Sequence, residues 1–288
     1  MKKFKRIYIE ITNCCNFRCS FCLDTKREKR YMSKEEFKIV IDKVKENVES
    51  VFLHVKGEPL LHKELEEILK ICEDAKLDVN ITTNGFFLED KKEILLKSKA
   101  LRQLNVSIHS IEENNFNKIT QDEYINKVIN ACKYINENSN VIISYRLWNL
   151  DDLENLSKDS KILDALKKAY NIENIEEAIQ KNHFIKLNKN TYINLDTKFV
   201  WPSLNNEVVS KCGSCYGLRQ QLGILVDGTV VPCCLDNDGD ITLGNIFTQS
   251  LQEILESKRA RNIVSGFLTG KLVEPLCKRC GFRENKRS

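Results

Sequence analysis

The chain has no long apolar run and no large excess of charge of one sign. No stretch approaches the ~18 apolar residues that a membrane-spanning helix needs. The first residues, MKKFKRIYIEITN, are basic, but their short apolar run contains Glu10, which is not the pattern of a secretory signal peptide. Basic residues number 45 and acidic residues 41, which argues against a dedicated nucleic-acid-binding protein. These absences predict a cytoplasmic protein that acts without nucleic acid and without a membrane.

Cysteine, in contrast, is abundant, with 12 in 288 residues. Most lie near the two ends of the chain: Cys14, Cys15, Cys19, Cys22, Cys212, Cys215, Cys233, Cys234, Cys277 and Cys280. A chain of this length buries a core without disulfides. Clustered thiols in a reducing compartment are more often metal ligands or catalytic groups than bridges. Cys72 and Cys132 lie on the apolar faces of predicted helices, where we expect core packing.

The first part of the chain alternates short strand-like runs with amphipathic helical runs. Strands are predicted at 6–12, 50–55, 77–83, 104–110, 141–148 and 191–195. Helices are predicted at 32–48, with a Ser33–Glu36 capping box, at 62–75, at 122–137 and from 151 to about 180. Such alternation predicts parallel strands with helical crossovers, here an α/β fold of the partial (β/α)6 TIM-like barrel type. Chemistry in barrels of this type lies at the carboxyl ends of the strands.

The pattern changes after Trp201-Pro202. An Asp227-Gly228 turn between two short strands predicts a hairpin, and residues 250–268 are helical in pattern. This region is too poor in apolar residues to hold itself together without a metal. The sequence therefore predicts a barrel domain at 1–202 and a small cysteine-rich α+β domain at 203–288.

Cys15, Cys19 and Cys22 have the spacing C-x3-C-x2-C at the end of the first predicted strand. Clustered thiolates select iron–sulfur clusters or zinc. A mononuclear zinc site usually needs a fourth ligand, and Cys14 is a poor one because adjacent side chains point apart. Three ligands on a four-iron cluster leave one iron open to a cofactor or substrate.

With Phe21 before the last cysteine, this loop resembles that of the radical S-adenosylmethionine (SAM) enzymes. VKGEPLLH is similar to the GGE motif of the family, with Lys56 in place of the first glycine. ITTNG ends the third predicted strand, as it often does in this family, and the serine of VSIHS matches a position that contacts the sugar of the cofactor. The resemblance implies SAM binding by Phe21, Gly57, Glu58, Asn84, Ser107 and Arg146, the last pairing with the cofactor carboxylate.

The resemblance also implies the chemistry. SAM would bind the open iron of a [4Fe-4S] cluster held by Cys15, Cys19 and Cys22. A reductant such as flavodoxin or ferredoxin would supply the electron that cleaves it to a 5′-deoxyadenosyl radical. That radical abstracts hydrogen from an unactivated carbon of the substrate.

The second set of cysteines resembles the SPASM extension of this family, or its shorter twitch form. Cys215, Gly228 and Cys233 fit the spacing, and Cys277 and Cys280 complete four ligands for one auxiliary [4Fe-4S] cluster. Further cysteines for a second auxiliary cluster are missing, which favours twitch. Cys212 and Cys234 are either spare thiols or replacement ligands. A zinc ribbon from the Cys212/Cys215 and Cys277/Cys280 pairs is a rival that leaves GTVVPCC unexplained.

Auxiliary clusters in these families take up an electron or anchor the substrate. We therefore expect an oxidoreductase-like radical SAM enzyme acting on a small molecule or short peptide. The short run before the first cysteines, without room for a leader-binding domain, favours this over a peptide- or protein-modifying enzyme. A metal-stabilised binding or electron-transfer protein that does not cleave SAM is the alternative of another class.

Candidates to face the substrate, or else to line the barrel, are Tyr145, Tyr192, Asp196, Lys198 and Trp201. The basic run KREKR at 26–30 is either a solvated loop or a contact for an anionic substrate.

Overall fold

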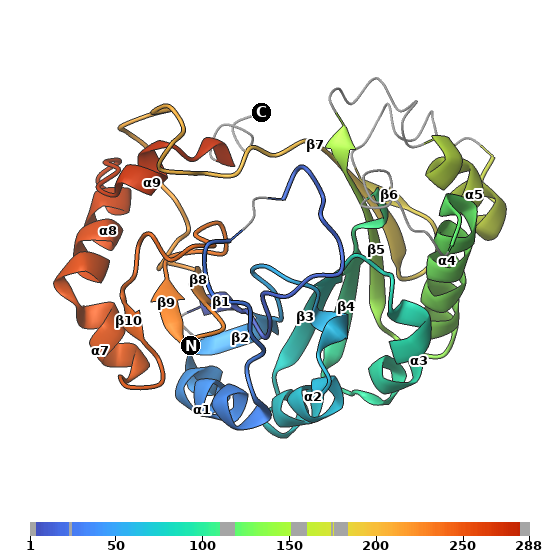
Figure 1. Cartoon of the computed structure of the whole chain (residues 1–288), viewed down its shortest axis with the longest axis horizontal. Coiled ribbons are helices and arrows are strands. Elements are labelled where there is room, and N and C mark those ends of the chain that lie inside the picture. The colour runs from blue at the N-terminus through green and yellow to red at the C-terminus, as the bar shows by residue number, and fades with distance from the viewer. Residues whose placement is uncertain are drawn as a thin grey trace. The chain divides into compact units, whose positions relative to one another are not determined.

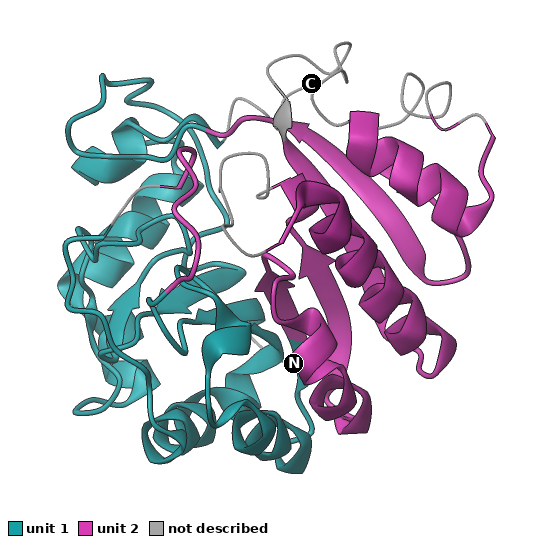
Figure 2. Ribbon diagram, turned by 45° about the vertical axis from the view of Figure 1, so that its right-hand side comes forward, with its two compact units in different colours: residues 1–14, 23–79, 200–288 teal, residues 15–22, 80–199 magenta. Residues whose placement is uncertain are grey.

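The computed structural model describes residues 4–22, 25–109, 119–150, 160–173, 175 and 184–282. The chain divides into two compact units (Figure 2). The first comprises Met1–Cys14, Leu23–Val79 and Val200–Ser288, and the second comprises Cys15–Cys22 and Asn80–Phe199. The cysteine-rich C-terminal region therefore shares a compact unit with the first strands of the chain.

The first unit is built on a mixed sheet with the strand order β10-β9-β8-β1-β2. Its strands are β1 (Phe4–Ile9), β2 (Val48–Phe52), β8 (Gln221–Ile224), β9 (Thr229–Val231) and β10 (Gly244–Asn245). Its helices are α1 (Lys34–Val44), η1 (Lys45–Asn47), η2 (Pro59–Leu61), α2 (Leu65–Asp74), α7 (Leu251–Glu256), α8 (Lys258–Leu268) and α9 (Pro275–Lys278). Strand β1 pairs in parallel with both β2 and β8, so the carboxyl ends of these three strands lie at one edge of the sheet.

The second unit has the strand order β3-β4-β5-β7-β6. Its strands are β3 (Asp78–Thr83), which begins in the first unit, β4 (Leu101–Val106), β5 (Ile142–Leu150), β7 (Thr191–Thr197) and β6 (Phe184–Lys186). The β4–β5 and β5–β7 pairs are parallel, as predicted, and β6 is antiparallel to β7. Helices α3 (Leu88–Lys97), α4 (Gln121–Glu137) and α5 (Ser160–Tyr170) flank these strands (Figure 1).

The buried faces follow the apolar pattern of the sequence. Ile7, Val51 and Leu104 in the strands are fully buried, as expected of parallel strands covered by helices. Cys72 and Cys132 are also fully buried, which confirms that they belong to the core. The predicted capping box at the start of α1 is present, since Ser33 accepts from Glu36 N and the Glu36 carboxylate accepts from Ser33 N.

Several elements differ from the prediction. The single helix expected at 250–268 is interrupted at Ser257, whose backbone is non-helical (ψ 148°) and whose side chain accepts from Ala260 N to cap α8. Helix α3 was not predicted, because only Leu88 and Leu95 of its residues are buried and the apolar period is weak. The fourth predicted strand lies at Leu101–Val106 rather than 104–110. Residue 110 and the helical prediction over 151–159 and 176–180 fall outside the described residues. No helix of the described part is long and apolar enough to cross a membrane.

Candidate functional site

In the first unit, the turn after β2 holds the chain just before Cys15. Gly57 has a φ of +77°, and a Cβ on it would lie 2.3 Å from Thr12 O and 2.8 Å from Cys14 O. The next residue, Glu58, donates its backbone N–H to Cys14 O at 2.8 Å. Only glycine allows this close approach, so the GE pair of the predicted motif positions the start of the cysteine loop.

The side chains of this turn are almost fully buried. The Glu58 carboxylate is 2% exposed and accepts from Leu60 N at 3.0 Å, which caps η2. Lys56, which stands where the resembled motif has glycine, is 7% exposed, and its ammonium lies 4.8 Å from the ring centroid of Trp201. Trp201 thus packs on the residue that departs from the motif.

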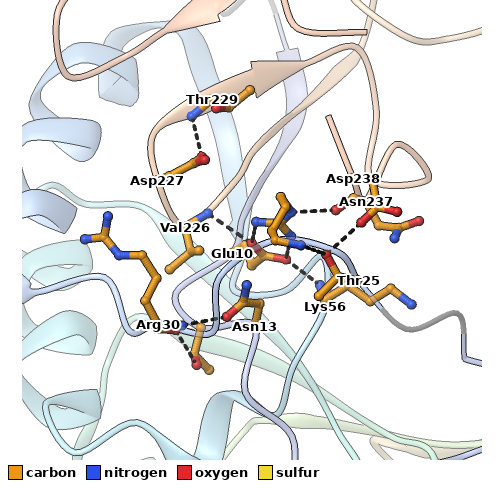
Figure 3. A network of polar contacts seen from close by, with 12 residues as sticks. Glu10, Asn13, Thr25, Arg30, Lys56, Val226, Asp227, Thr229, Asn237 and Asp238 are labelled. Atoms are coloured by element: carbon orange, nitrogen blue, oxygen red, sulfur yellow. Dashed lines mark hydrogen bonds and ion pairs between the residues drawn. The ribbon is translucent and has the colours of Figure 1, made fainter. Parts of the chain in front are cut away.

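A buried carboxylate links the loop after the cysteines to the C-terminal region (Figure 3). Glu10 is fully buried at the end of β1 and accepts from both Arg27 Nη atoms at 2.7 Å. It also accepts from Lys56 N at 3.1 Å and Val226 N at 3.0 Å. Arg27 Nε donates to Asn237 O at 2.9 Å. A planar guanidinium satisfies such a carboxylate and the carbonyl together, which fixes three chain segments to one another.

Two arginines of the KREKR run form ion pairs with carboxylates. Arg27 pairs with Glu10, and Arg30 Nη2 contacts both oxygens of Glu36, at 2.6 and 2.7 Å. The run is therefore not simply a solvated loop.

In the second unit, the cysteine loop is anchored by aromatic and amide contacts. The Phe17 ring lies 5.9 Å from that of Phe86 and 6.3 Å from that of Tyr124. Asn84 Nδ2 donates to Asn16 Oδ1 at 2.9 Å, and it lies 3.9 Å from Cys15 Sγ. Asn84, predicted from the ITTNG stretch, therefore touches the loop and one of its cysteines.

The carboxyl ends of β3, β4 and β5 meet beside the same loop. Arg146 Nη1 donates to Thr82 Oγ1 at 3.4 Å, and its guanidinium lies 4.3 Å from the Trp148 ring centroid. His109 Nδ1 lies 2.8 Å from Arg146 O, so we assign the proton to Nδ1 as donor. The His109 ring also lies 5.1 Å from that of Phe21. A continuous set of contacts thus joins Phe21 to Arg146.

Ser107 follows β4 directly, and its backbone N–H donates to Thr83 O at 2.8 Å. His109 was not identified as a site residue from the sequence. The available signal was the alternation in VSIHS, which places His109 on the same side of an extended chain as Ser107.

Near the C-terminus, the four cysteines expected to hold an auxiliary cluster line one cavity. Cys215, Cys233, Cys277 and Cys280 share this cavity with apolar side chains, among them Pro232, Leu235, Ile241, Phe267 and Leu276. Burial, with a contribution from neighbouring thiols, raises the pKa of Cys277 to about 12 and that of Cys233 well above its ordinary value. Thiols in such surroundings ionise only when a nearby cation compensates the charge. The donor set therefore fits an iron–sulfur cluster.

The two ambiguous cysteines lie apart from this cavity lining. Cys212 is exposed, and its backbone forms an isolated antiparallel β-bridge with that of Lys271. Burial raises the pKa of the Cys234 thiol to about 11, although a hydrogen bond with the Tyr8 hydroxyl opposes this shift. In the part of the chain that the structure describes, no three His, Cys, Asp or Glu side chains surround the position of a single metal ion.

The candidates to face the substrate have varied surroundings. Tyr145 is fully buried and its hydroxyl lies 3.0 Å from that of Tyr170 on α5, which favours the packing role that the sequence offered as its alternative. Its ring points into the helix-covered core because β5 is lined by helices on that side. Tyr192 stacks on Phe184, with 4.7 Å between the ring centroids. Asp196 and Lys198 are exposed.

Comparison with known proteins identifies the family. Residues 9–158, more than half of the chain, match the model of the radical SAM superfamily. This chain is a radical SAM protein. Residues 212–281 match the iron–sulfur cluster-binding domain named SPASM. As a radical SAM enzyme with a SPASM domain, it uses SAM, a SAM-binding [4Fe-4S] cluster and an auxiliary iron–sulfur cluster, which confirms the predicted cofactors.

Curated relatives of the chain are named GTP 3',8-cyclases. It is 28% identical over 270 residues to a "Probable GTP 3',8-cyclase" of Methanocaldococcus jannaschii, covering 82% of this chain and 87% of the relative. Two solved structures share the fold. BtrN in complex with AdoMet and 2-DOIA has a TM-score of 0.60 at 18% identity, with 97% of this chain and 94% of that chain covered. Streptococcus suis SuiB bound to its precursor peptide SuiA has a TM-score of 0.62 at 17% identity, with 97% and 70% covered. The predicted α/β fold with a partial barrel is thereby confirmed.

Proposed function

We propose that this radical SAM enzyme abstracts a hydrogen atom from a small molecule or short peptide and oxidises it, with the auxiliary cluster taking up the electron. The observation that carries this proposal is that Cys215, Cys233, Cys277 and Cys280 line the same cavity. Four thiolates complete the ligation of a four-iron cluster. A cluster without an open iron is suited to accept an electron rather than to anchor a substrate. We infer one auxiliary cluster, as in the twitch form.

The roles of the loop and strand-end residues follow from their positions. Cys15, Cys19 and Cys22 would hold the first cluster, which when reduced supplies the electron that cleaves SAM. Glu58 would accept from the ammonium of SAM and Arg146 would bind its carboxylate. Phe21, Gly57, Asn84 and Ser107 would shape the rest of the SAM site. Their contacts to the loop and to the strand ends support this assignment.

A second candidate is the cyclisation of GTP, which the name of the Methanocaldococcus jannaschii relative states. The 28% identity over most of both chains favours it. Incubation with SAM, reductant and GTP tests it directly, since formation of a cyclised nucleotide would replace the oxidation proposal.

Iron content tests the ligand assignment. We expect about eight irons per chain after anaerobic reconstitution, four for each cluster. The variant Cys15→Ala/Cys19→Ala/Cys22→Ala should keep about four irons and lose SAM cleavage, and Cys277→Ala/Cys280→Ala should also keep about four. Cys212→Ala, which removes an exposed thiol outside the cavity lining, is the matched control and should keep about eight. Zinc in place of iron, or loss of a cluster in Cys212→Ala, would contradict the assignment.

A further inference from the structure

One surface of the first unit includes a segment, residues 208–216, that contributes Cys215 to the lining of the auxiliary cavity. The segment 208–216 runs along the C-terminal helices, where Val209 N donates to Lys278 O at 2.9 Å and Gly213 N donates to Gly270 O at 2.8 Å. Leu272 N donates to Lys211 O at 3.0 Å. In Figure 1 the chain between β7 and β8 passes across α9 in this region. These bonds place the segment beside the C-terminal end of α8 and beside α9.

The exposed side chains on this surface are apolar and basic. We name it the 208–216 surface and define it by Val208, Val209, Lys211, Tyr216, Leu268, Lys271 and Lys278. Val208, Val209, Tyr216 and Leu268 are between 41% and 66% exposed. Lys211 and Lys271 are exposed and Lys278 is half-exposed. Solvent-exposed apolar groups gathered in this way mark interaction sites.

The charge of the surface is uncompensated within the described chain. None of Lys211, Lys271 and Lys278 forms an ion pair with a residue that the structure describes. Glu207 is the acidic neighbour in the adjoining sequence, and Glu274 is turned inward to Arg259. Lysines without an ion-pair partner beside exposed apolar side chains select and steer a negatively charged partner.

Two of the cysteines that line the auxiliary cavity belong to the segments that form this surface. Cys215 belongs to the segment 208–216 itself, and Cys277 lies on α9, one residue before Lys278. Both line the auxiliary cavity. A partner docked on the 208–216 surface would therefore lie close to the auxiliary cluster.

We propose that the 208–216 surface docks a small acidic electron-carrier protein. The proposal rests on the proposed function, because an enzyme that takes an electron from its substrate must pass it on. The carrier arrives oxidised, takes up one electron from the auxiliary site and leaves reduced, with no atom transferred. A second copy of this chain is a poorer occupant, since it would bring the same basic side chains to face the lysines.

Binding of a purified acidic flavodoxin to the reconstituted enzyme, measured by calorimetry at several salt concentrations, tests the proposal. We expect the affinity to fall as ionic strength rises. Lys211→Glu/Lys271→Glu should weaken binding at low salt by at least about tenfold, because like charges then face the partner. Lys258→Glu/Arg261→Glu, an equal charge change at two exposed positions near the start of α8, is the control and should stay within about twofold of the wild type, since both positions lie off the docking surface. The neutral pair Lys211→Gln/Lys271→Gln should give an intermediate loss and replaces the reversal variant if that variant binds no iron.

A second readout separates this proposal from the proposed function. Dithionite needs no docking surface, so it should support 5′-deoxyadenosine formation equally in the wild type and in Lys211→Glu/Lys271→Glu. Absence of 5′-deoxyadenosine with dithionite in the wild type would refute the proposed function, whatever the binding result. Absence of flavodoxin binding, equal binding by the reversal variant, or self-association of the wild type through this surface would overturn the docking proposal.

Discussion

The ion pair between Glu10 and Arg27 offers a stringent test of how the first unit is held together. The Glu10 side chain is fully buried and that of Arg27 is 13% exposed. In Arg27→Ala the carboxylate would keep only the backbone N–H groups of Lys56 and Val226 as donors. Breaking a buried pair by removing one partner costs about 3–5 kcal/mol, because an uncompensated charge stays buried. Asn237 O would also lose its donor, which adds about 1 kcal/mol.

The assay is thermal and urea denaturation of the protein without clusters. A loss of this size should lower the melting temperature by on the order of 10 °C in a chain of this length. Arg30→Ala is the matched control, since Arg30 also contacts both oxygens of its carboxylate partner, through Nη2, but this pair is about one third exposed. It should cost less than about 1 kcal/mol.

A double variant isolates the charge effect. Glu10→Gln/Arg27→Ala removes the buried charge along with its partner, so it should be more stable than the sum of the single variants by about 2 kcal/mol or more. Equal costs for Arg27→Ala and Arg30→Ala, or strict additivity in the double variant, would refute the reasoning.

Three further predictions concern single positions. Gly57→Ala should lower the iron content of the first cluster, because its Cβ would overlap Thr12 O; Gly270→Ala, with φ +72° and no heavy atom within 4 Å, should keep both clusters. His109→Ala should raise KM for SAM more than it lowers kcat, since Phe21 and Arg146 both lose a contact, and His109→Asn, which keeps a donor for Arg146 O, should recover part of the loss. Tyr145→Phe should cost about 1 kcal/mol of stability with unchanged turnover, because its hydroxyl forms a hydrogen bond with that of Tyr170 in the core; a large loss of turnover would favour a substrate contact instead.

The parallel strands could be predicted because each is a short apolar run with a clear boundary, and the strand-end motifs follow from that topology. The pairing of β8 with β1 could not, since it joins residues more than 200 positions apart and no local pattern encodes that register. The sequence instead suggested a separate C-terminal domain beginning at residue 203. Whether that division describes an independently folding domain stays a prediction.

The site shows the same limit. Glu10 served only as evidence against a signal peptide, and its partner lies 17 residues later in a run that suggested a solvated loop. Their ion pair depends on the fold, which places the loop that contains Arg27 against the end of β1. The resemblance already selected Cys215, Cys233, Cys277 and Cys280, but it left the roles of Cys212 and Cys234 open. Spacing could not separate adjacent residues such as Cys233 and Cys234, whose side chains have different surroundings in the fold.

Cleavage of SAM tests the central claim most directly. The reconstituted protein is reduced with dithionite in the presence of SAM, and 5′-deoxyadenosine is quantified against the Cys15→Ala/Cys19→Ala/Cys22→Ala variant. We predict 5′-deoxyadenosine from the wild type and none above background from the variant. Reconstituted wild type that holds both clusters and still forms no 5′-deoxyadenosine would contradict the account and leave a metal-stabilised binding or electron-transfer protein.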